Sequence, residues 1–228
     1  MTENNSQRAV LFDLDGTLVD TAPDLVNALK ALCAHVKKPL AARNDWSGLV
    51  SHGAARLIET ALGPQDQGTM DRYLAYFLDH YEHHIYEDSH LFDGVRALLA
   101  FCRSNGWALG VVTNKKQALA EKILEQAGLS DWFGTLIGGD TVGCSKPDPA
   151  PVWAACEALK TRPDQAILVG DDQRDVEAAR RAGVMSIVAG WGYGVASIEP
   201  ELLSHAECCR TPVEVQRVLQ LWGPSSVD

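Results

Sequence analysis

The stretch Ala9–Asp20 (AVLFDLDGTLVD) decides the fold, because it leads from a run of apolar residues through closely spaced acids. Its first four residues are apolar and an aspartate follows, a pattern typical of a buried strand. We therefore predict a strand over Ala9–Asp13. A helix is predicted to begin directly afterwards, with Thr21 as its cap, Pro23 in its first turn and Asp24 three residues beyond the cap.

A long helical stretch follows this first strand. Further helices are predicted over Ser51–Leu62 and Asp66–Tyr86 from apolar residues at helical spacing. In the second of these, the apolar residues form one stripe, more typical of core packing than of a cofactor site: Met70, Tyr73, Leu74, Phe77 and Tyr81. The whole stretch 21–88 is therefore predicted to be helical.

From Asp93 onward, strands and helices alternate. The predicted helices are Gly94–Ser104, Lys116–Gln126, Ala150–Lys160 and Asp175–Ala182. The predicted strands are Trp107–Thr113, Leu136–Ile137, Ala166–Val169 and Val184–Val188. Such alternation with short connections indicates a parallel sheet covered by helices on both faces.

The lone first strand belongs to that sheet, because a single strand is not stable alone. We therefore predict an α/β fold, a Rossmann-like parallel-sheet core with a helical cap inserted after the first strand. The core would comprise residues 1–20 and 89–228, and the cap residues 21–88. A length of 228 residues fits one large core with such an insertion.

The composition is typical of a globular protein, with 46% hydrophobic and 22% charged residues. Twenty basic and thirty acidic residues give a net charge of −10, which argues against nucleic acid and anionic membranes as partners. Apolar runs such as AVLF and ALLAF are far shorter than the ~20 residues that span a bilayer.

The compartment is predicted from two further features. The N-terminal residues MTENNSQ carry no signal-peptide pattern, and the six cysteines include no C-x-x-C pair. The cysteines are expected to be small buried hydrophobic residues in a reducing compartment, so we expect a cytoplasmic protein. The sequence leaves the oligomeric state open between a monomer and a homodimer.

Polar residues gather where the predicted strands end. They are Asp13 and Asp15 after the first strand, Thr113 and Asn114 after the next, Lys146 in a later loop, and Asp171 and Asp172 after Gly170. Ligands of open α/β sheets bind beyond the carboxyl ends of the strands. These residues are therefore expected to share one site.

The acids of this group predict a metal site. Asp13 and Asp15 stand two residues apart, and neighbouring carboxylates raise each other's pKa by repulsion. A divalent cation removes that conflict, and Asp171, Asp172 and Asp175 add oxygen ligands of the hard type that suits Mg²⁺. With a lysine and backbone amides nearby, this combination fits phosphoryl transfer.

Four ordered motifs resemble those of the haloacid dehalogenase-like (HAD) hydrolases: Asp13–Asp20 (DLDGTLVD), Val112–Asn114 (VTN), Lys146–Pro149 (KPDP) and Gly170–Asp175 (GDDQRD). The resemblance covers residues 9 to about 195. A lone D-x-D would be weak, but the four motifs together are highly specific. The resemblance implies the HAD fold for the core.

The resemblance also implies catalytic roles. Asp13 would attack phosphorus and form an aspartyl-phosphate. Asp15 would protonate the leaving oxygen and then act as a base toward the water that hydrolyses the intermediate. Mg²⁺ would be held by the side chains of Asp13 and Asp171 and by the main-chain carbonyl of Asp15.

Supporting roles follow from the same resemblance. Thr113 and the Asn114 amide would bind phosphate oxygens, and Lys146 would neutralise the phosphoryl group. Asp175 would orient Lys146 or the waters around the metal, one layer outside the metal ligands. Asp172 stands where many relatives carry a serine, and we expect it to act in that outer layer or to contact the cap.

Asp15 also narrows the reaction. At this place dehalogenases have the pattern D-x-Y and phosphorylated ion pumps have D-x-T. The aspartate at position 15 therefore favours a phosphomonoesterase or a mutase. The helical insertion is similar to the caps of the phosphoglycolate phosphatase and β-phosphoglucomutase branch, which select the substrate. We therefore predict a Mg²⁺-dependent phosphomonoesterase, phosphoglycolate phosphatase-like, acting on a small phosphate monoester.

An alternative substrate comes from shorter segments. Val50–Arg56 (VSHGAAR) and His90–Gly94 (HLFDG) resemble the part of that branch associated with N-acetylmuramic acid 6-phosphate hydrolysis in cell-wall recycling. His52 and Arg56 are the candidate substrate contacts. A β-phosphoglucomutase-like phosphosugar mutase and a non-catalytic phosphate-binding HAD module stay open as further alternatives.

Two other patterns are interpreted as structural. His80, His83 and His84 lie in a predicted cap helix without the H-E-x-x-H order of zinc proteases, and are expected on a solvated face. Gly190–Gly194 (GWGYG) lacks the G-x-G-x-x-G spacing of dinucleotide loops and is expected to form a turn beside the site.

Overall fold

One sheet of six strands organises the core in the computed structural model, which describes residues 7–41 and 46–222. Its strands are β1 (Ala9–Phe12), β4 (Ala108–Val112), β5 (Thr135–Ile137), β6 (Ala166–Gly170), β7 (Met185–Ala189) and β8 (Ala206–Cys209). Their order is β5-β4-β1-β6-β7-β8, and every neighbouring pair is parallel. The predicted α/β fold with a parallel sheet is therefore confirmed.

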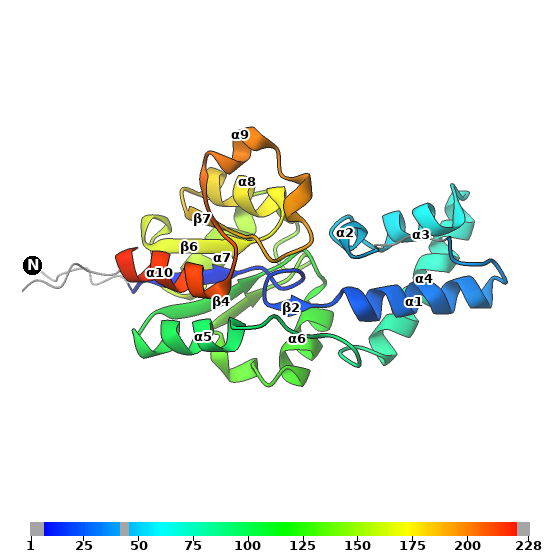
Figure 1. The fold of residues 1–228 in the computed structure, drawn as a ribbon, viewed down its shortest axis with the longest axis horizontal. Helices are drawn as coiled ribbons and strands as arrows, with labels where there is room; N and C mark the ends of the chain where they lie inside the picture. The colour runs from blue at the N-terminus through cyan, green and yellow to red at the C-terminus, as the bar shows by residue number, and fades with distance from the viewer. Residues whose placement is uncertain (1–6, 42–45, 223–228) are drawn as a thin grey trace, which may run out of the picture.

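Helices cover both faces of this sheet (Figure 1). The core helices are α5 (Val95–Ser104), α6 (Gln117–Gln126), α7 (Ala150–Ala158), α8 (Gln173–Ala182), α9 (Pro200–Leu203) and α10 (Pro212–Trp222). Because successive side chains of a strand point to opposite faces, β1 contributes to two hydrophobic clusters. Val10 and Phe12 pack with α5, α6 and α10, whereas Ala9 and Leu11 pack with α7 and α8.

Among the described residues of the cap, on the right of Figure 1, there are four helices. They are α1 (Ala22–His35), α2 (Ser47–Val50), α3 (Ala54–Leu62) and α4 (Gln67–His83). The short antiparallel pair β2 (Val19–Asp20) and β3 (His90–Leu91) carries the chain out of the core and back. The cap has a hydrophobic cluster of its own, in which Phe77 and Tyr81 are buried and the rest of the predicted α4 stripe packs against them.

The predicted domain boundaries stay a prediction. All four cap helices lie inside the predicted range 21–88, and β3 follows it. The outer limits of the predicted core, residues 1 and 228, lie outside the described residues, as do residues 42–45 of the predicted cap.

One local prediction was wrong and another held only in part. The helix predicted over Ser51–Leu62 begins at Ala54 instead, because Gly53 has a φ of +85° and the chain turns there between α2 and α3. Thr21 is the N-cap residue of α1 as predicted, but its side chain makes no capping hydrogen bond. Asp24 instead accepts hydrogen bonds from the backbone of Asp88 (2.8 Å) and the hydroxyl of Ser89 (2.5 Å), and so ties α1 to the returning chain.

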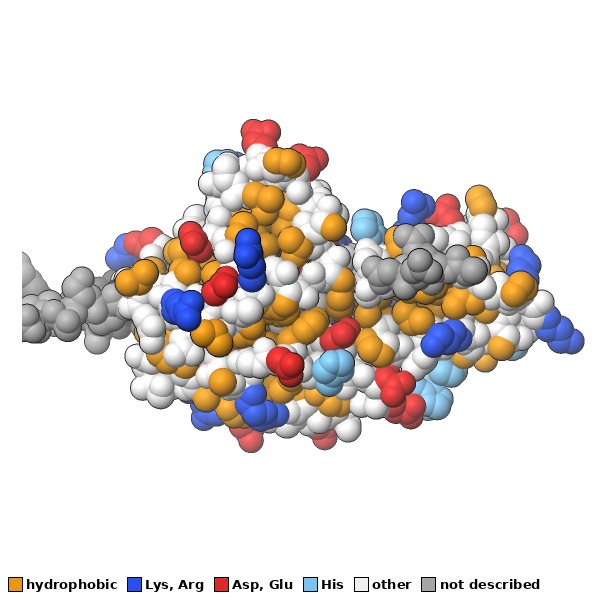
Figure 2. Space-filling model, in the orientation of Figure 1, with side chains coloured by type: hydrophobic (Ala, Val, Ile, Leu, Met, Phe, Trp, Pro, Cys, Tyr) orange, Lys and Arg blue, Asp and Glu red, His pale blue; other side chains and the backbone are white. Residues whose placement is uncertain are grey.

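The surface mixes charged and apolar side chains. Figure 2 shows acidic and basic groups dispersed over the viewed face rather than gathered by sign. All six cysteines are free; four are buried, Cys144 is partly buried and Cys208 is exposed. Within the described ranges, no helix combines the length and apolar character needed to traverse a lipid bilayer.

Candidate active site

A cavity of about 290 Å³ lies where the carboxyl ends of β1, β4 and β6 face the cap. Asp13, Thr113 and Asp171 each follow one of these adjacent strands and line the cavity. Backbone bonds continue the sheet into the site, since the Asp13 amide donates to the Val169 carbonyl at 2.9 Å. The predicted convergence of strand ends therefore occurs at one cavity.

Lys146 is a buried cation at the base of this site, with a side chain only 3% exposed. Its Nζ lies 2.9 Å from Asp13 Oδ1 and 2.5 Å from Asp175 Oδ1, and it donates a hydrogen bond to the Val112 carbonyl at 2.6 Å. Burial opposes the charge, but the two carboxylates outweigh it and raise the pKa of Lys146. The two carboxylates therefore favour the charged form of Lys146.

Asn114 fixes the backbone of Lys146 through its side chain. The Asn114 amide donates to the Lys146 carbonyl at 2.8 Å, and the Lys146 amide donates to Asn114 Oδ1 at 2.9 Å. This paired contact bridges the loop after β4 and the loop before α7. The role predicted for Asn114 used its backbone amide, so the structure adds a positioning contact to it.

Asp13, Asp171 and Asp175 form a compact group of acids, with one oxygen of each lying within 4.8 Å of the others. Burial, together with the charges of Asp13 and Asp175, raises the pKa of Asp171 well above its ordinary value. Burial likewise raises the pKa of Asp175 to about 7 despite Lys146. Buried carboxylates that repel one another are a donor set suited to a hard divalent cation.

Close backbone approach shapes the surroundings of Asp171. Gly16 has a φ of +82°, and a Cβ built there would lie 2.4 Å from Asp171 Oδ2. Asp171 accepts hydrogen bonds from Thr17 Oγ1 at 3.1 Å and from the Gly194 amide at 2.8 Å. The glycine-rich run Gly190–Gly194 therefore contacts Asp171 directly, which the sequence prediction of a turn beside the site did not specify.

Asp15 lies in the same cavity, but its carboxylate is separate from the three-acid group. Lys115 Nζ lies 2.9 Å from one of its oxygens and 3.1 Å from the other. Thr21 Oγ1 donates to Asp15 at 2.5 Å and lies 3.1 Å from the Tyr193 hydroxyl. These contacts explain why the side chain of Thr21 makes no capping hydrogen bond at the start of α1: its hydroxyl donates to Asp15 instead.

Lys115 also connects Asp15 to the cap. Its Nζ lies 4.9 Å from the ring centre of Tyr81, a buried residue of α4. Burial disfavours the charge, but Asp15 outweighs this and raises the pKa of Lys115. Sequence reasoning missed Lys115, although it directly follows Asn114 at a strand end and could have been found by the same rule.

Asp172 is the N-cap residue of α8 and pairs with Arg174. Its carboxylate accepts a hydrogen bond from the Arg174 amide at 2.9 Å, while its own amide donates to Asp175 at 3.1 Å. Arg174 Nε lies 2.7 Å from Asp172, and Arg174 Nη2 donates to the Ser51 carbonyl at 2.5 Å. Asp172 thus reaches the cap through Arg174, a residue that sequence reasoning missed.

The two predicted substrate contacts lie in different places. His52 lines the cavity in the turn between α2 and α3. Arg56 is not among the lining residues; its side chain is 58% exposed and forms an ion pair with Glu59 at 2.9 Å. Among described residues, the three-acid group is the only cluster of potential metal ligands, so the histidines of α4 do not form one.

The chain is similar to known proteins along most of its length. A family model described as haloacid dehalogenase-like hydrolase matches residues 10–189. The phosphoglycolate phosphatase of Xanthomonas campestris pv. campestris (strain 8004) is 37% identical over 219 residues, covering 96% of both chains. The N-acetylmuramic acid 6-phosphate phosphatase of Pseudomonas putida is 40% identical over 196 residues, covering 85% of this chain and 86% of that protein.

The fold has close counterparts among solved structures. The crystal structure of a predicted phosphoglycolate phosphatase from Haemophilus somnus 129PT matches with a TM-score of 0.82 at 26% identity. The match covers 95% of this chain and 99% of that one. With its ordered motifs meeting at one edge of the sheet and these relatives along most of its length, the chain belongs to the haloacid dehalogenase-like hydrolase family.

Proposed function

We propose that this protein is a Mg²⁺-dependent phosphomonoesterase that hydrolyses a small phosphorylated metabolite. The observation that carries the proposal is the pairing of Asp13 with the buried Lys146 at 2.9 Å, in a cavity that Asp15 also lines. A carboxylate beside a fixed cation can act as a nucleophile toward a phosphoryl group whose charge that cation offsets. The names of the relatives, all phosphatases among those cited, support this reaction class.

The first step is phosphoryl transfer to Asp13. A carboxylate oxygen of Asp13 forms a bond to phosphorus while the bond from phosphorus to the leaving oxygen breaks. Asp15, positioned by Lys115 and Thr21, is protonated when the substrate is bound and gives that proton to the leaving oxygen; it takes up a proton again in the second step. The alcohol product leaves, and the phosphoryl group stays on Asp13.

The second step is hydrolysis. Asp15 takes a proton from a water molecule that attacks phosphorus, the bond to Asp13 breaks and phosphate leaves. Thr113 and Lys146 offset the charge of the phosphoryl oxygens in both steps. Asp13 and Asp171, with Asp175 beside them, would hold Mg²⁺, which supplies further positive charge to the phosphoryl group.

The proposal is tested by measuring phosphate release in Mg²⁺ from p-nitrophenyl phosphate, 2-phosphoglycolate and N-acetylmuramate 6-phosphate. We expect turnover of at least one of the two metabolites. The Pseudomonas putida relative favours the amino sugar as the second candidate. Isomer formation without phosphate release would indicate a mutase, and binding without turnover a non-catalytic module; either result overturns the proposal.

Magnesium is expected to raise the thermal stability of the protein. Binding of Mg²⁺ to the folded state alone contributes about 2.7 kcal/mol at 100 times its Kd, or roughly 5–10 °C in Tm for a chain of this size. Asp171→Asn should remove most of that shift, because it removes a carboxylate from the three-acid group. Thermal unfolding with EDTA and with Mg²⁺ measures both values.

The matched control is Asp79→Asn, which changes an exposed carboxylate of α4 outside the cavity. It should keep the full magnesium shift. An Asp171→Asn protein that keeps the shift would place the metal elsewhere.

A further inference from the structure

Arg174 is held by the core and the cap at once, on the wall of the catalytic cavity. The Asp172 carboxylate accepts hydrogen bonds from Arg174 Nε at 2.7 Å and from Nη2 at 3.1 Å. The Ser51 carbonyl accepts a further hydrogen bond from Nη2 at 2.5 Å. The guanidinium side chain remains 35% exposed. A planar group fixed from two sides presents its remaining donors in one orientation.

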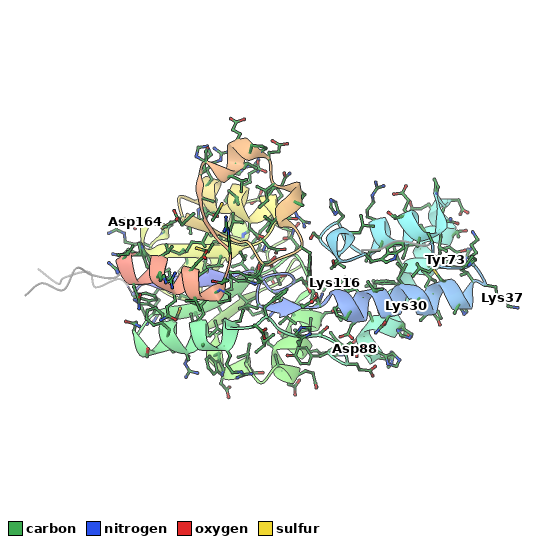
Figure 3. All side chains as sticks on the ribbon, in the orientation of Figure 1. Lys30, Lys37, Tyr73, Asp88, Lys116 and Asp164 are labelled. Carbon is green, nitrogen blue, oxygen red and sulfur yellow. The ribbon has the colours of Figure 1, made fainter. Side chains whose placement is uncertain are left out.

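Those remaining donors belong to Nη1. Within residues 7–41 and 46–222, Nη1 of Arg174 makes no hydrogen bond. The two lysines of the cavity wall differ from Arg174: Lys115 is held by Asp15, and Lys116 is exposed where the core meets the cap (Figure 3). Arg174 is thus a fixed cationic side chain of the wall with N–H groups left for a ligand.

The cap places a second unused polar group beside it. Ser51 Oγ is buried and has no hydrogen-bond partner, although the carbonyl of the same residue is bound by Arg174. A buried hydroxyl without a partner is costly unless a ligand or water satisfies it. Gly53, two residues on, has nothing within 4 Å of a Cβ built there, so the turn leaves open space.

The charge of Arg174 is already balanced by Asp172, whose two carboxylate oxygens accept hydrogen bonds from Nε and Nη2 of the guanidinium group. What Arg174 offers a ligand is therefore hydrogen bonds from one nitrogen rather than net positive charge. Such a donor suits a neutral oxygen, a hydroxyl or an amide carbonyl, better than a second carboxylate. The rest of the wall is largely apolar: Leu25, Val50, Leu57, Phe77, Leu78 and Leu119.

We propose that Arg174, with Ser51 beside it, selects the leaving group by hydrogen-bonding a neutral oxygen of a sugar-sized alcohol. The inference rests on the proposed phosphomonoesterase function and names its substrate class, a phosphorylated sugar or amino sugar. The cavity of about 290 Å³ is close to the lower end of the range of roughly 300–1,000 Å³ for small-molecule sites. A two-carbon acid would leave most of this cavity unfilled.

The test measures binding in an Asp13→Asn background, so that it does not depend on turnover. Calorimetry in Mg²⁺ compares N-acetylglucosamine 6-phosphate, 2-phosphoglycolate and ethyl phosphate. We expect the sugar phosphate to bind about tenfold or more tightly than the other two. Adding Arg174→Met should weaken the sugar phosphate by roughly 10–100-fold and ethyl phosphate by no more than about twofold. Phosphate release by the wild type tests the proposed function separately.

Two further variants complete the design. Arg180→Met changes an exposed arginine of the same helix outside the cavity and should leave all three affinities unchanged. Ser51→Ala should weaken the binding of the sugar phosphate only, and it provides the test of the proposal if Arg174→Met fails to fold. Tighter binding of 2-phosphoglycolate than of the sugar phosphate overturns the proposal. Equal losses for all three ligands also overturn it, because Arg174 would then act only by holding the cap.

Discussion

Asp13→Asn is expected to lower kcat for phosphate release by about 10³-fold or more, because the amide oxygen is too weak a nucleophile to attack phosphorus. The fold should survive the change. Asparagine is nearly isosteric with aspartate, and the Asp13 amide keeps its backbone bond to Val169 at 2.9 Å. Steady-state kinetics with p-nitrophenyl phosphate in Mg²⁺, beside a thermal unfolding scan, measures both quantities.

Asp79→Asn is the matched control for this change, since Asp79 is an exposed acid of α4. It should leave kcat within about twofold of the wild type, as surface substitutions away from a site do. An Asp13→Asn enzyme that retains its activity while folded would show that another group attacks phosphorus.

Lys146→Met is expected to reduce kcat/KM by roughly 10²–10³-fold, because it removes the fixed cation that stabilises the negative charge developing on the phosphoryl group. It also leaves the Asp13 and Asp175 carboxylates, 2.9 and 2.5 Å from Nζ in the wild type, without their cation. Breaking a buried ion pair costs about 3–5 kcal/mol of folding free energy. We expect the lower end of that range, because Asp175 can take up a proton.

The stability loss of Lys146→Met should depend on pH. Burial raises the folded pKa of Asp175 to about 7 from an ordinary value of 3.8, so the folded state binds more protons than the unfolded state. In metal-free protein, stability should therefore fall as pH rises from about 4 to 7. Removing Lys146 raises this pKa further, so the fall in stability should continue above pH 7 in the variant, whereas it should level off near pH 7 in the wild type. Denaturant unfolding in EDTA from about pH 4 to about pH 9 measures both profiles.

Lys30→Met is the control for Lys146→Met, since Lys30 is an exposed residue of α1 labelled in Figure 3. It should change neither the activity nor the pH dependence. A fall in stability that levels off at the same pH in Lys146→Met and the wild type would contradict the view that Lys146 offsets buried carboxylates.

The sequence predicted the sheet and the residues at its strand ends, for a physical reason. In a parallel sheet the carboxyl ends meet at one edge, so Asp13, Thr113 and Asp171 could be assigned to one site before their contacts were known. The buried strands β1, β4 and β6 are short apolar runs that periodicity detects. The half-exposed edge strand β8 (AECC) lacks that signal, and no strand was predicted there.

Contacts between the cap and the core could not be predicted in the same way. Arg174, Lys115 and Thr21 owe their roles to the positions of Ser51, Tyr81 and Asp15 in space, and no spacing rule relates these pairs. Arg56 stands in a segment that resembles relatives, yet its side chain pairs with Glu59 outside the cavity. The direction of a side chain on a short cap helix depends on where the helix starts, and the turn at Gly53 sets the start of α3.

The central claim is that Asp13 carries the phosphoryl group during turnover. Rapid acid quench of a single turnover, followed by borohydride reduction and peptide mass spectrometry, tests it directly. Borohydride reduces the acyl phosphate of an aspartate to a primary alcohol and so converts that residue to homoserine. The account predicts homoserine at position 13 in the wild type and none in Asp13→Asn. Phosphate release in a burst with no modification of Asp13, or modification of another residue, would contradict it.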